Sequence, residues 1–163
     1  MRPRCVPRTR QVADGPVAHG PVTDGPAKEE VEYRWRGEAT DAELVALVEA
    51  HGGHSEPGWW DQIRPVSLGW VTARGPAGEL VGFVNVAWDG GDHAFLLDTK
   101  VASAYQRRGI ATLLVAEAVR QAKAAGCEWI HVDFEDHLAP FYFGACGFRP
   151  TAAGLIHLPG IQS

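Results

Sequence analysis

The stretch from Val101 to Thr112 combines small residues, an amide and positive charge in a pattern that suits phosphate binding. Free backbone N–H groups at a helix N-terminus attract anions, and the helix dipole strengthens that attraction. Gly109 lets a ligand approach the backbone closely, and Arg107 and Arg108 add positive charge where phosphates would lie. The segment therefore predicts a binding site for a cofactor that carries phosphate groups.

Two common phosphate loops are absent from the chain. It contains neither G-x-G-x-x-G, the loop of dinucleotide-binding folds, nor G-x-x-x-x-G-K-[ST], the loop that holds a nucleoside triphosphate. The alternative to a phosphate-binding segment is an ordinary loop between a strand and a helix that happens to contain a pair of arginines.

A strand must end and a helix must begin at this segment for it to bind phosphate. Residues 94–101 predict the strand, and the apolar spacing from residue 108 or 109 to 125 predicts the helix, which Gly126 ends. A second strand over 128–134 makes this unit a right-handed parallel crossover. Since ligands bind at the carboxyl ends of strands in open α/β sheets, the crossover places the segment at a binding edge.

The remaining elements predict an α/β (α+β) fold with a mixed, mostly antiparallel sheet around a central parallel β-α-β crossover. Turn residues between 74 and 78 join two strands into a hairpin. The other expected elements are a strand over 31–36, a helix from Thr40 or Asp41 to 51–53, an aromatic segment over 59–63, strands over 68–73 and 80–87, a short helix over 138–145 and a last strand over 155–158.

Residues 106–111, Q-R-R-G-I-A, resemble the signature of the GNAT acetyltransferase superfamily, Gln/Arg-x-x-Gly-x-Gly/Ala. Val101 stands five residues before Gln106, as in that family, and Asp98 is also a frequent choice there. Residues 146–148, Cys-Gly-Phe, resemble a second family motif. The resemblance implies an acyl-CoA N-acyltransferase-like domain over residues 31–163, with acetyl-CoA as the acyl donor.

The resemblance also implies roles for individual residues. Backbone amides would hold the pyrophosphate, and an acceptor amine would attack the thioester directly, without a covalent enzyme intermediate. The pyrophosphate residues implied are Gln106, Arg107, Arg108, Gly109, Ile110, Ala111 and Thr112. The pantetheine arm would pair with Thr99, Lys100 and Val101, and a backbone N–H near Val101 would polarise the thioester carbonyl.

The chain departs from the family where an acid and a base are usual. Phe95 occupies the position of the frequent base, and Phe143 that of the frequent tyrosine. Tyr142, its neighbour, points about 100° away on an ideal helix, so it faces elsewhere unless the helix is locally distorted. Tyr142 is the best acid candidate, with a packing role as the alternative.

The base must therefore come from another position. His131, Asp133 and Glu135 share one face of the expected strand over 128–134, and Glu135 lies nearest its carboxyl end. We favour Glu135 as the base. A chain of water molecules with no dedicated residue is the alternative. Asp98 lies on the strand before the signature, where the family often has its base, but a structural role would also account for its frequency in the family.

Trp59 and Trp60 are candidates for the acceptor site, because in the family the segment after the first helix helps to form it. With Glu56 and Asp61 nearby, the pair would suit an apolar, cationic amine, whereas simple core packing is the alternative. We expect no metal: neither His51 with His54 nor the group 131–137 has a recognised zinc spacing.

Composition sets the wider limits. The chain has 163 residues and a net charge of -5, and five basic but only two acidic residues lie within 1–28, so the rest is strongly acidic. An acidic body argues against nucleic-acid binding. With Gly-Pro steps at residues 15, 20 and 25, we expect residues 1–30 to be a disordered tail.

The cellular setting is an expectation from the same composition. No apolar run approaches the roughly 18 residues of a membrane helix, and no secretory signal is seen. Three unpaired cysteines fit a reduced compartment, so we expect a cytoplasmic protein with no membrane partner. Exposed sheet edges would allow a homodimer.

The leading hypothesis is an N-acetyltransferase that acts on a primary amine of a small molecule or protein. A module that senses acyl-CoA without turnover is the alternative, since the usual base and tyrosine are missing. A structural domain with an unused pocket is a third interpretation.

Overall fold

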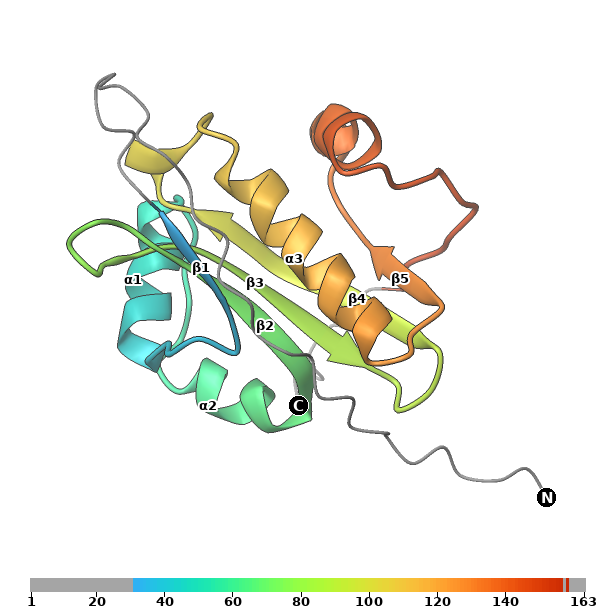
Figure 1. The fold of residues 1–163 in the computed structure, drawn as a ribbon, viewed down its shortest axis with the longest axis horizontal. Coiled ribbons are helices and arrows are strands. Elements are labelled where there is room, and N and C mark those ends of the chain that lie inside the picture. Colours follow the sequence, from blue (N-terminus) through green and yellow to red (C-terminus); the bar gives the residue numbers. More distant parts are fainter. Residues whose placement is uncertain (1–30, 157, 159–163) are drawn as a thin grey trace, which may run out of the picture.

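The computed structural model describes residues 31–156 and 158. One mixed sheet runs in the order β1-β2-β3-β4-β5, antiparallel except for the parallel pair of β4 and β5 (Figure 1). The strands are β1 (Glu32–Trp35), β2 (Ser67–Arg74), β3 (Leu80–Trp88), β4 (His93–Val101) and β5 (Trp129–Val132). The predicted sheet and its single parallel crossover are confirmed. The expected tail over 1–30 lies outside the described residues.

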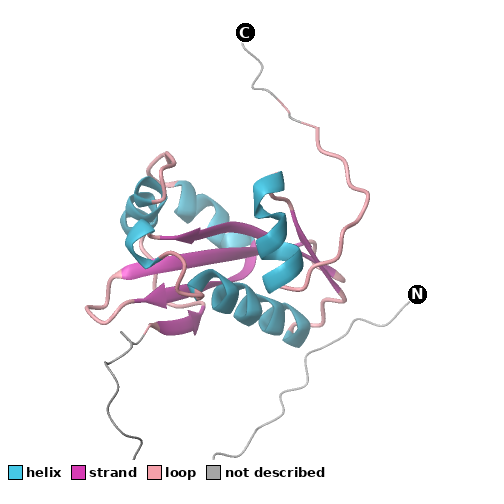
Figure 2. Ribbon diagram, turned by 90° about the horizontal axis from the view of Figure 1, so that it is seen from above, coloured by secondary structure: helices cyan, strands magenta, loops and turns pink. Residues whose placement is uncertain are grey.

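Three α-helices cover the two faces of this sheet. Helix α3 (Ile110–Ala124) connects β4 to β5 on one face, while α1 (Asp41–Ala50) and the short α2 (Trp59–Ile63) cover part of the other (Figure 2). Short 3-10 turns occupy 64–66, 103–105 and 136–138, and a π-helix spans Pro140–Ala145. None of the described helices combines the length and apolar character that crossing a bilayer requires.

The main core lies between α3 and the sheet. Alternate residues of the central strands meet the apolar stripe of the helix: Val71, Ala73, Val84, Val86, Ala94 and Leu96 face Ile110, Leu114, Val115, Ala118 and Ala122. Gly82 lets the helix come close, because a Cβ there would lie 2.9 Å from Leu114 Cδ1 and 3.2 Å from Ile110 Cγ2. The first turn of α3 is therefore held tightly against β3.

A smaller core lies under α1 and α2. It contains Leu44, Leu47, Trp60 and Phe83, all buried. Helix α1 begins where the sequence predicts, with Thr40 as N-cap: the Thr40 side chain accepts from the Glu43 N–H, and the Glu43 carboxylate accepts from the Thr40 N–H.

A β-bulge interrupts β4 just before its carboxyl end. Phe83 pairs with Lys100 and Asn85 with Leu97, so Asp98 and Thr99 together oppose one residue of β3. Asp98 has a positive φ of 55°, which aspartate tolerates better than most residues. Pairing of β4 with β5 ends at Leu96 and Val132, before the bulge. The predicted strand over 128–134 is therefore too long, because its partner turns away.

The predicted last strand over 155–158 is wrong for the described residues. Residues 149–156 and 158 form no strand. Leu155, Ile156 and Leu158 are exposed by more than four-fifths, so their apolar pattern meets neither a core nor a partner strand. A strand requires both, and alternation in sequence supplies neither.

Candidate functional site

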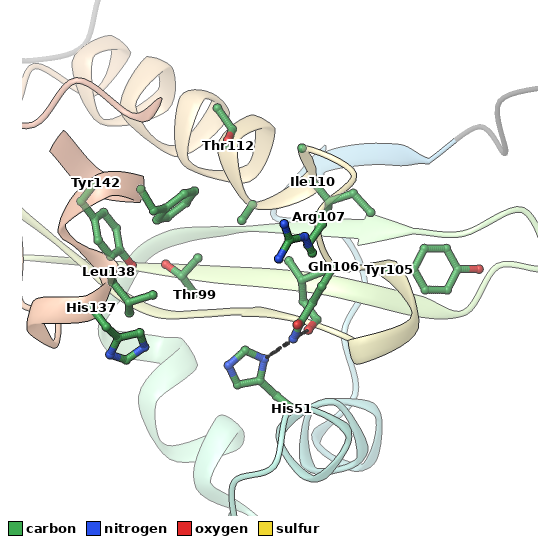
Figure 3. Close-up of a pocket in the computed structure, with 14 residues that line it drawn as sticks. His51, Thr99, Tyr105, Gln106, Arg107, Ile110, Thr112, His137, Leu138 and Tyr142 are labelled. Atoms are coloured by element: carbon green, nitrogen blue, oxygen red, sulfur yellow. Dashed lines mark hydrogen bonds between the residues drawn. The ribbon is translucent and has the colours of Figure 1, made fainter. Parts of the chain in front are cut away.

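A cavity of about 530 Å³ opens where β4 and β5 part (Figure 3). Its walls come from the end of α1, the end of β4, the loop before α3, the first turn of α3 and the segment after β5. The lining residues are His51, Thr99, Val101, Tyr105, Gln106, Arg107, Gly109, Ile110, Ala111, Thr112, His137, Leu138, Phe141 and Tyr142. Eight of the ten cofactor residues implied by the sequence lie in this wall.

The bulge decides which side chains of β4 face the cavity. Because the bulge adds one residue, Thr99 and Val101 fall on the same face as the buried Leu96, while Lys100 falls on the opposite face. Thr99 and Val101 line the cavity, but Lys100 does not; its Nζ lies 3.4 Å from Asp98 Oδ1. The expected residues on β4 are therefore only partly brought together.

The N-terminus of α3 supplies backbone donors that no side chain caps. Gly109 is its N-cap residue, with φ 81°, and no side-chain hydrogen bond caps the helix there. Arg107 also has a positive φ, 62°, so the loop turns sharply just before the helix. Helix α1, by contrast, has a complete capping box. The first amides of α3 therefore lie at the cavity wall as donors for an anion.

The two arginines of this loop differ in position. Arg107 lines the cavity, whereas Arg108 does not. The Arg108 guanidinium lies 4.9 Å from the centroid of the Tyr105 ring and donates to the Ala104 carbonyl at 3.0 Å. Side-chain charge at the cavity therefore comes from Arg107, and the expectation that both arginines face the phosphates is not met in this structure.

Tyr142 reaches the cavity because the segment from 140 to 145 is a π-helix. The Cys146 N–H donates to the Phe141 carbonyl, a five-residue spacing that rotates side chains relative to an α-helix. Tyr142 is 5% exposed, and its hydroxyl points toward Thr99 in Figure 3. Burial raises the pKa of Tyr142 above its ordinary value, while the Thr99 side chain lowers it by less. The phenol therefore stays protonated at neutral pH.

His51 and His137 line the cavity. From the sequence, we weighed them only as possible metal ligands. His51 Nδ1 lies 3.2 Å from the Val101 carbonyl oxygen, which also accepts from Gln106 Nε2 at 3.2 Å. His51 is the C-cap residue of α1, a position that side-chain patterning does not mark as functional. Only the topology reveals that this helix end lies beside the loop before α3.

Glu135, the favoured base, does not line the cavity. Since β5 ends at Val132, Asp133 and Glu135 lie beyond it rather than on a shared strand face. The Glu135 side chain is 84% exposed, and its Oε2 lies 3.3 Å from Nδ1 of His137. The carboxylate thus contacts a residue of the cavity wall without being part of that wall.

Trp59 and Trp60 lie away from the cavity wall. Trp60 is fully buried, contacts Trp70 and Phe83 edge-to-face at 4.9 and 5.1 Å, and donates its indole N–H to the Ala39 carbonyl. Trp60 is therefore a core residue in this structure, as the packing alternative expects. Trp59 packs against the same core, and its buried Nε1 has no hydrogen-bond partner.

The cysteines of the described chain are not placed for nucleophilic catalysis. Cys127 and Cys146 are partly buried, neither lines the cavity, and burial raises the pKa of both thiols. Within residues 31–156 and 158, no group of three or more His, Cys, Asp or Glu side chains is arranged to hold a metal ion.

The cavity thus offers different chemistry at its two ends. One end has the first amides of α3 and the Arg107 guanidinium, which suit phosphates, and the other has a buried phenol, Tyr142, beside Thr99 (Figure 3). A ligand that joins a phosphate group to a polar reactive group by an extended arm would match both ends.

Comparisons with known proteins identify the fold and the family of the chain. In sequence, 121 residues are 32% identical to a mycothiol acetyltransferase of Nocardia farcinica, covering 64% of this chain and 37% of that protein's length. A GNAT family acetyltransferase from Streptococcus pneumoniae TIGR4 shares the fold with a TM-score of 0.68 and 22% identity, over 80% of this chain and 99% of that one.

A further solved structure with the same fold is of a protein in complex with CoA. It is the aminoglycoside N-acetyltransferase AAC(6')-Iy, with a TM-score of 0.65 and 19% identity, over 83% of this chain and 98% of that one. The family model described as acetyltransferase (GNAT) family matches residues 32–148, most of the chain. The resemblance inferred from the signature is thereby confirmed: the chain belongs to the GNAT acetyltransferase family.

Proposed function

We propose that this chain is an N-acetyltransferase that binds acetyl-CoA in the cavity and transfers the acetyl group to a primary amine by direct attack. The observation that carries the proposal is the combination, in one cavity, of an uncapped helix N-terminus and a buried tyrosine. Family membership supports acetyl-CoA as the donor.

The pyrophosphate would bind at the N-terminus of α3. The amides of Ile110, Ala111 and Thr112 supply donors, the helix dipole favours negative charge, and Arg107 adds a guanidinium. A Cβ on Gly109 would meet no protein atom within 4 Å, so the space above this residue is open to a ligand. Local donors thereby bind an anion despite the acidic composition of the body.

The pantetheine arm would lie along the end of β4. The Ala102 N–H donates to the Val81 carbonyl, so the N–H of Ala102 faces β3. In an antiparallel ladder, the N–H of the neighbouring residue Val101 then points away from β3. It points to the side of β4 on which β5 pairs only as far as Leu96. This N–H would donate to the arm or polarise the thioester carbonyl.

Catalysis would depend mainly on holding the amine and thioester together. None of the described residues that line the cavity is a cysteine, which supports direct attack rather than an acyl-enzyme. The Tyr142 hydroxyl would donate to the sulfur as the C–S bond breaks. Because burial raises the pKa of Tyr142, hydrogen bonding to the developing thiolate is favoured over full proton transfer ahead of bond breaking.

The acceptor is proposed to be a small-molecule amine. Two similar proteins are named for small molecules, mycothiol and the aminoglycosides, and this supports a small acceptor over a protein amine. The matched region covers little more than a third of the length of the mycothiol acetyltransferase.

The test measures binding and turnover separately. Calorimetry with acetyl-CoA should show one site per chain, and release of free CoA thiol should accelerate with at least one small primary amine. Absence of acetyl-CoA binding at millimolar ligand would contradict the proposal. Binding without thiol release across a broad amine panel would favour the acyl-CoA sensor.

A further inference from the structure

We propose that His137 is the catalytic base of the transfer and that Glu135 positions its ring. The inference rests on the proposed function and names a residue for a step that the chain's departures from the family leave unassigned. It replaces Glu135 itself as base, because the Glu135 carboxylate is not in the cavity wall.

His137 lies at the reactive end of the cavity. With the phosphates at the N-terminus of α3, the thioester comes to the opposite end, where Tyr142 and Thr99 lie. Figure 3 places His137 with Leu138 and Tyr142 at that end, apart from Arg107 and Ile110. His51 lies nearer the loop end, since it contacts Gln106 and the Val101 carbonyl. Of the two imidazoles that the described residues contribute to the wall, His137 is thus the one beside the reacting bond.

The contact with Glu135 places a negative charge beside one nitrogen of His137. Glu135 Oε2 lies 3.3 Å from Nδ1, and because a carboxylate can only accept a hydrogen bond, this oxygen favours the ring form with its proton on Nδ1. The neutral ring then has its lone pair on Nε2, as a base requires. Because the Glu135 and His137 side chains are 84% and 68% exposed, water screens the charge, and the main role of Glu135 is to fix the ring.

The proton balance of the step is simple. As the amine nitrogen bonds to the thioester carbon, one amine proton moves to Nε2 of His137. The tetrahedral intermediate then collapses, the C–S electron pair goes to sulfur, and the thiolate takes a proton from Tyr142 or water. His137 returns its proton to solvent, and Tyr142, where it has given up a proton, takes one back from solvent, so the products are an amide and free CoA.

The experiment compares His137→Gln and Glu135→Gln with the wild type, and His54→Gln serves as the control. His54 also pairs with a glutamate two residues away, Nε2 to Glu56 Oε1 at 3.0 Å, and both side chains are exposed, but His54 is not in the cavity wall. Release of CoA thiol from acetyl-CoA is measured with glycinamide and with water as nucleophiles, across the pH range in which imidazole titrates. Acetyl-CoA affinity is measured by calorimetry.

The expected result for His137→Gln is a fall in kcat of about 10²-fold with acetyl-CoA affinity nearly unchanged, and loss of the low-pH limb of the profile. Glu135→Gln should lower kcat several-fold, whereas His54→Gln should leave kcat unchanged. Among the described residues, the other titratable or charged groups of the cavity wall are His51, Tyr105, Arg107 and Tyr142. An intact low-pH limb in His137→Gln would therefore assign the base elsewhere and overturn the proposal.

A second measurement is independent of turnover. The tautomer of His137 is read from nitrogen-15 NMR of the protein with acetyl-CoA bound, and its signals are assigned by their loss in His137→Gln. The proton should lie on Nδ1, and Glu135→Ala should weaken that preference. A proton mainly on Nε2 would overturn the inference, while failure of acetyl-CoA to bind would count against the proposed function instead.

Discussion

Tyr142 faces the cavity only because of the local geometry of its helical segment. On a regular helix its neighbour, Phe143, would occupy the usual tyrosine position, but Phe143 is 37% exposed and is not in the cavity wall. The π-helix turns Tyr142 inward instead. The sequence predicts that a distortion would be needed, but it contains no signal for the distortion itself.

Replacing Tyr142 by Phe tests the role of its hydroxyl. The ring packs between Phe134 and Phe141, at 4.7 Å from both centroids, and that packing is retained in the variant. We expect kcat to fall about tenfold to a hundredfold, the value of one hydrogen bond to a developing charge, with acetyl-CoA affinity unchanged. Steady-state kinetics and calorimetry measure both quantities. Unchanged kcat would leave Tyr142 with packing alone.

Positions on β4 show where residue-level prediction stops. The resemblance implies a run of three residues beside the pantetheine, yet Lys100 faces away because a bulge shifts the alternation. Arg108 likewise contacts Tyr105 rather than the cavity. A bulge depends on pairing with another strand, so the sequence of β4 alone cannot reveal it.

The N-termini of α1 and α3 show how capping separates a structural helix from one that can bind a ligand. Thr40 and Glu43 satisfy the first amides of α1, and Glu43 also pairs with Arg74 at 2.8 Å. Helix α3 begins at Ile110, and its N-cap residue, Gly109, has no side chain that could accept from the first amides. The sequence predicts both starting points, because serine, threonine, aspartate and glycine mark them.

The capping box of α1 should make the free energy of unfolding depend on pH in the acid range. The Arg74 side chain and Thr40 hold the pKa of Glu43 down to about 2, below its ordinary 4.5, despite partial burial. Because the pKa of Glu43 is lower in the folded state, its ionised carboxylate stabilises the fold at pH values above the ordinary pKa of 4.5. This contribution is lost as the pH falls from 4.5 through about 2.

We therefore expect Glu43→Gln to lower the free energy of unfolding at neutral pH and to flatten its decline between pH 4.5 and about 2. Urea unfolding at several pH values measures this, with Glu49→Gln on the same helix as a control. Thr40→Ala should cost about 1 kcal/mol. A Glu43→Gln curve that runs parallel to the wild type would contradict the linkage.

At the scale of the whole molecule, the site is assembled from segments far apart in the chain. His51, Thr99, Gly109 and Tyr142 come from four elements that only the fold brings to one cavity. The segment expected to bind phosphates is predictable from sequence, because it is one continuous stretch with a strand before it and a helix after it. The sequence names Tyr142 as the candidate acid but not its orientation, and it does not single out His137, because both depend on where β4 and β5 part and on the path of the chain after β5.

Binding of acetyl-CoA by Gly109→Glu tests whether the cofactor pyrophosphate binds at the N-terminus of α3. Gly126→Glu is the matched control: Gly126 also has a positive φ, 95°, and open space around it, but follows the far end of α3. Both variants carry similar backbone strain of about 1 kcal/mol, so any difference between them reports the ligand site. We predict that Gly109→Glu weakens acetyl-CoA binding by at least about tenfold in calorimetry, whereas Gly126→Glu binds like the wild type. Wild-type affinity in Gly109→Glu would contradict this prediction.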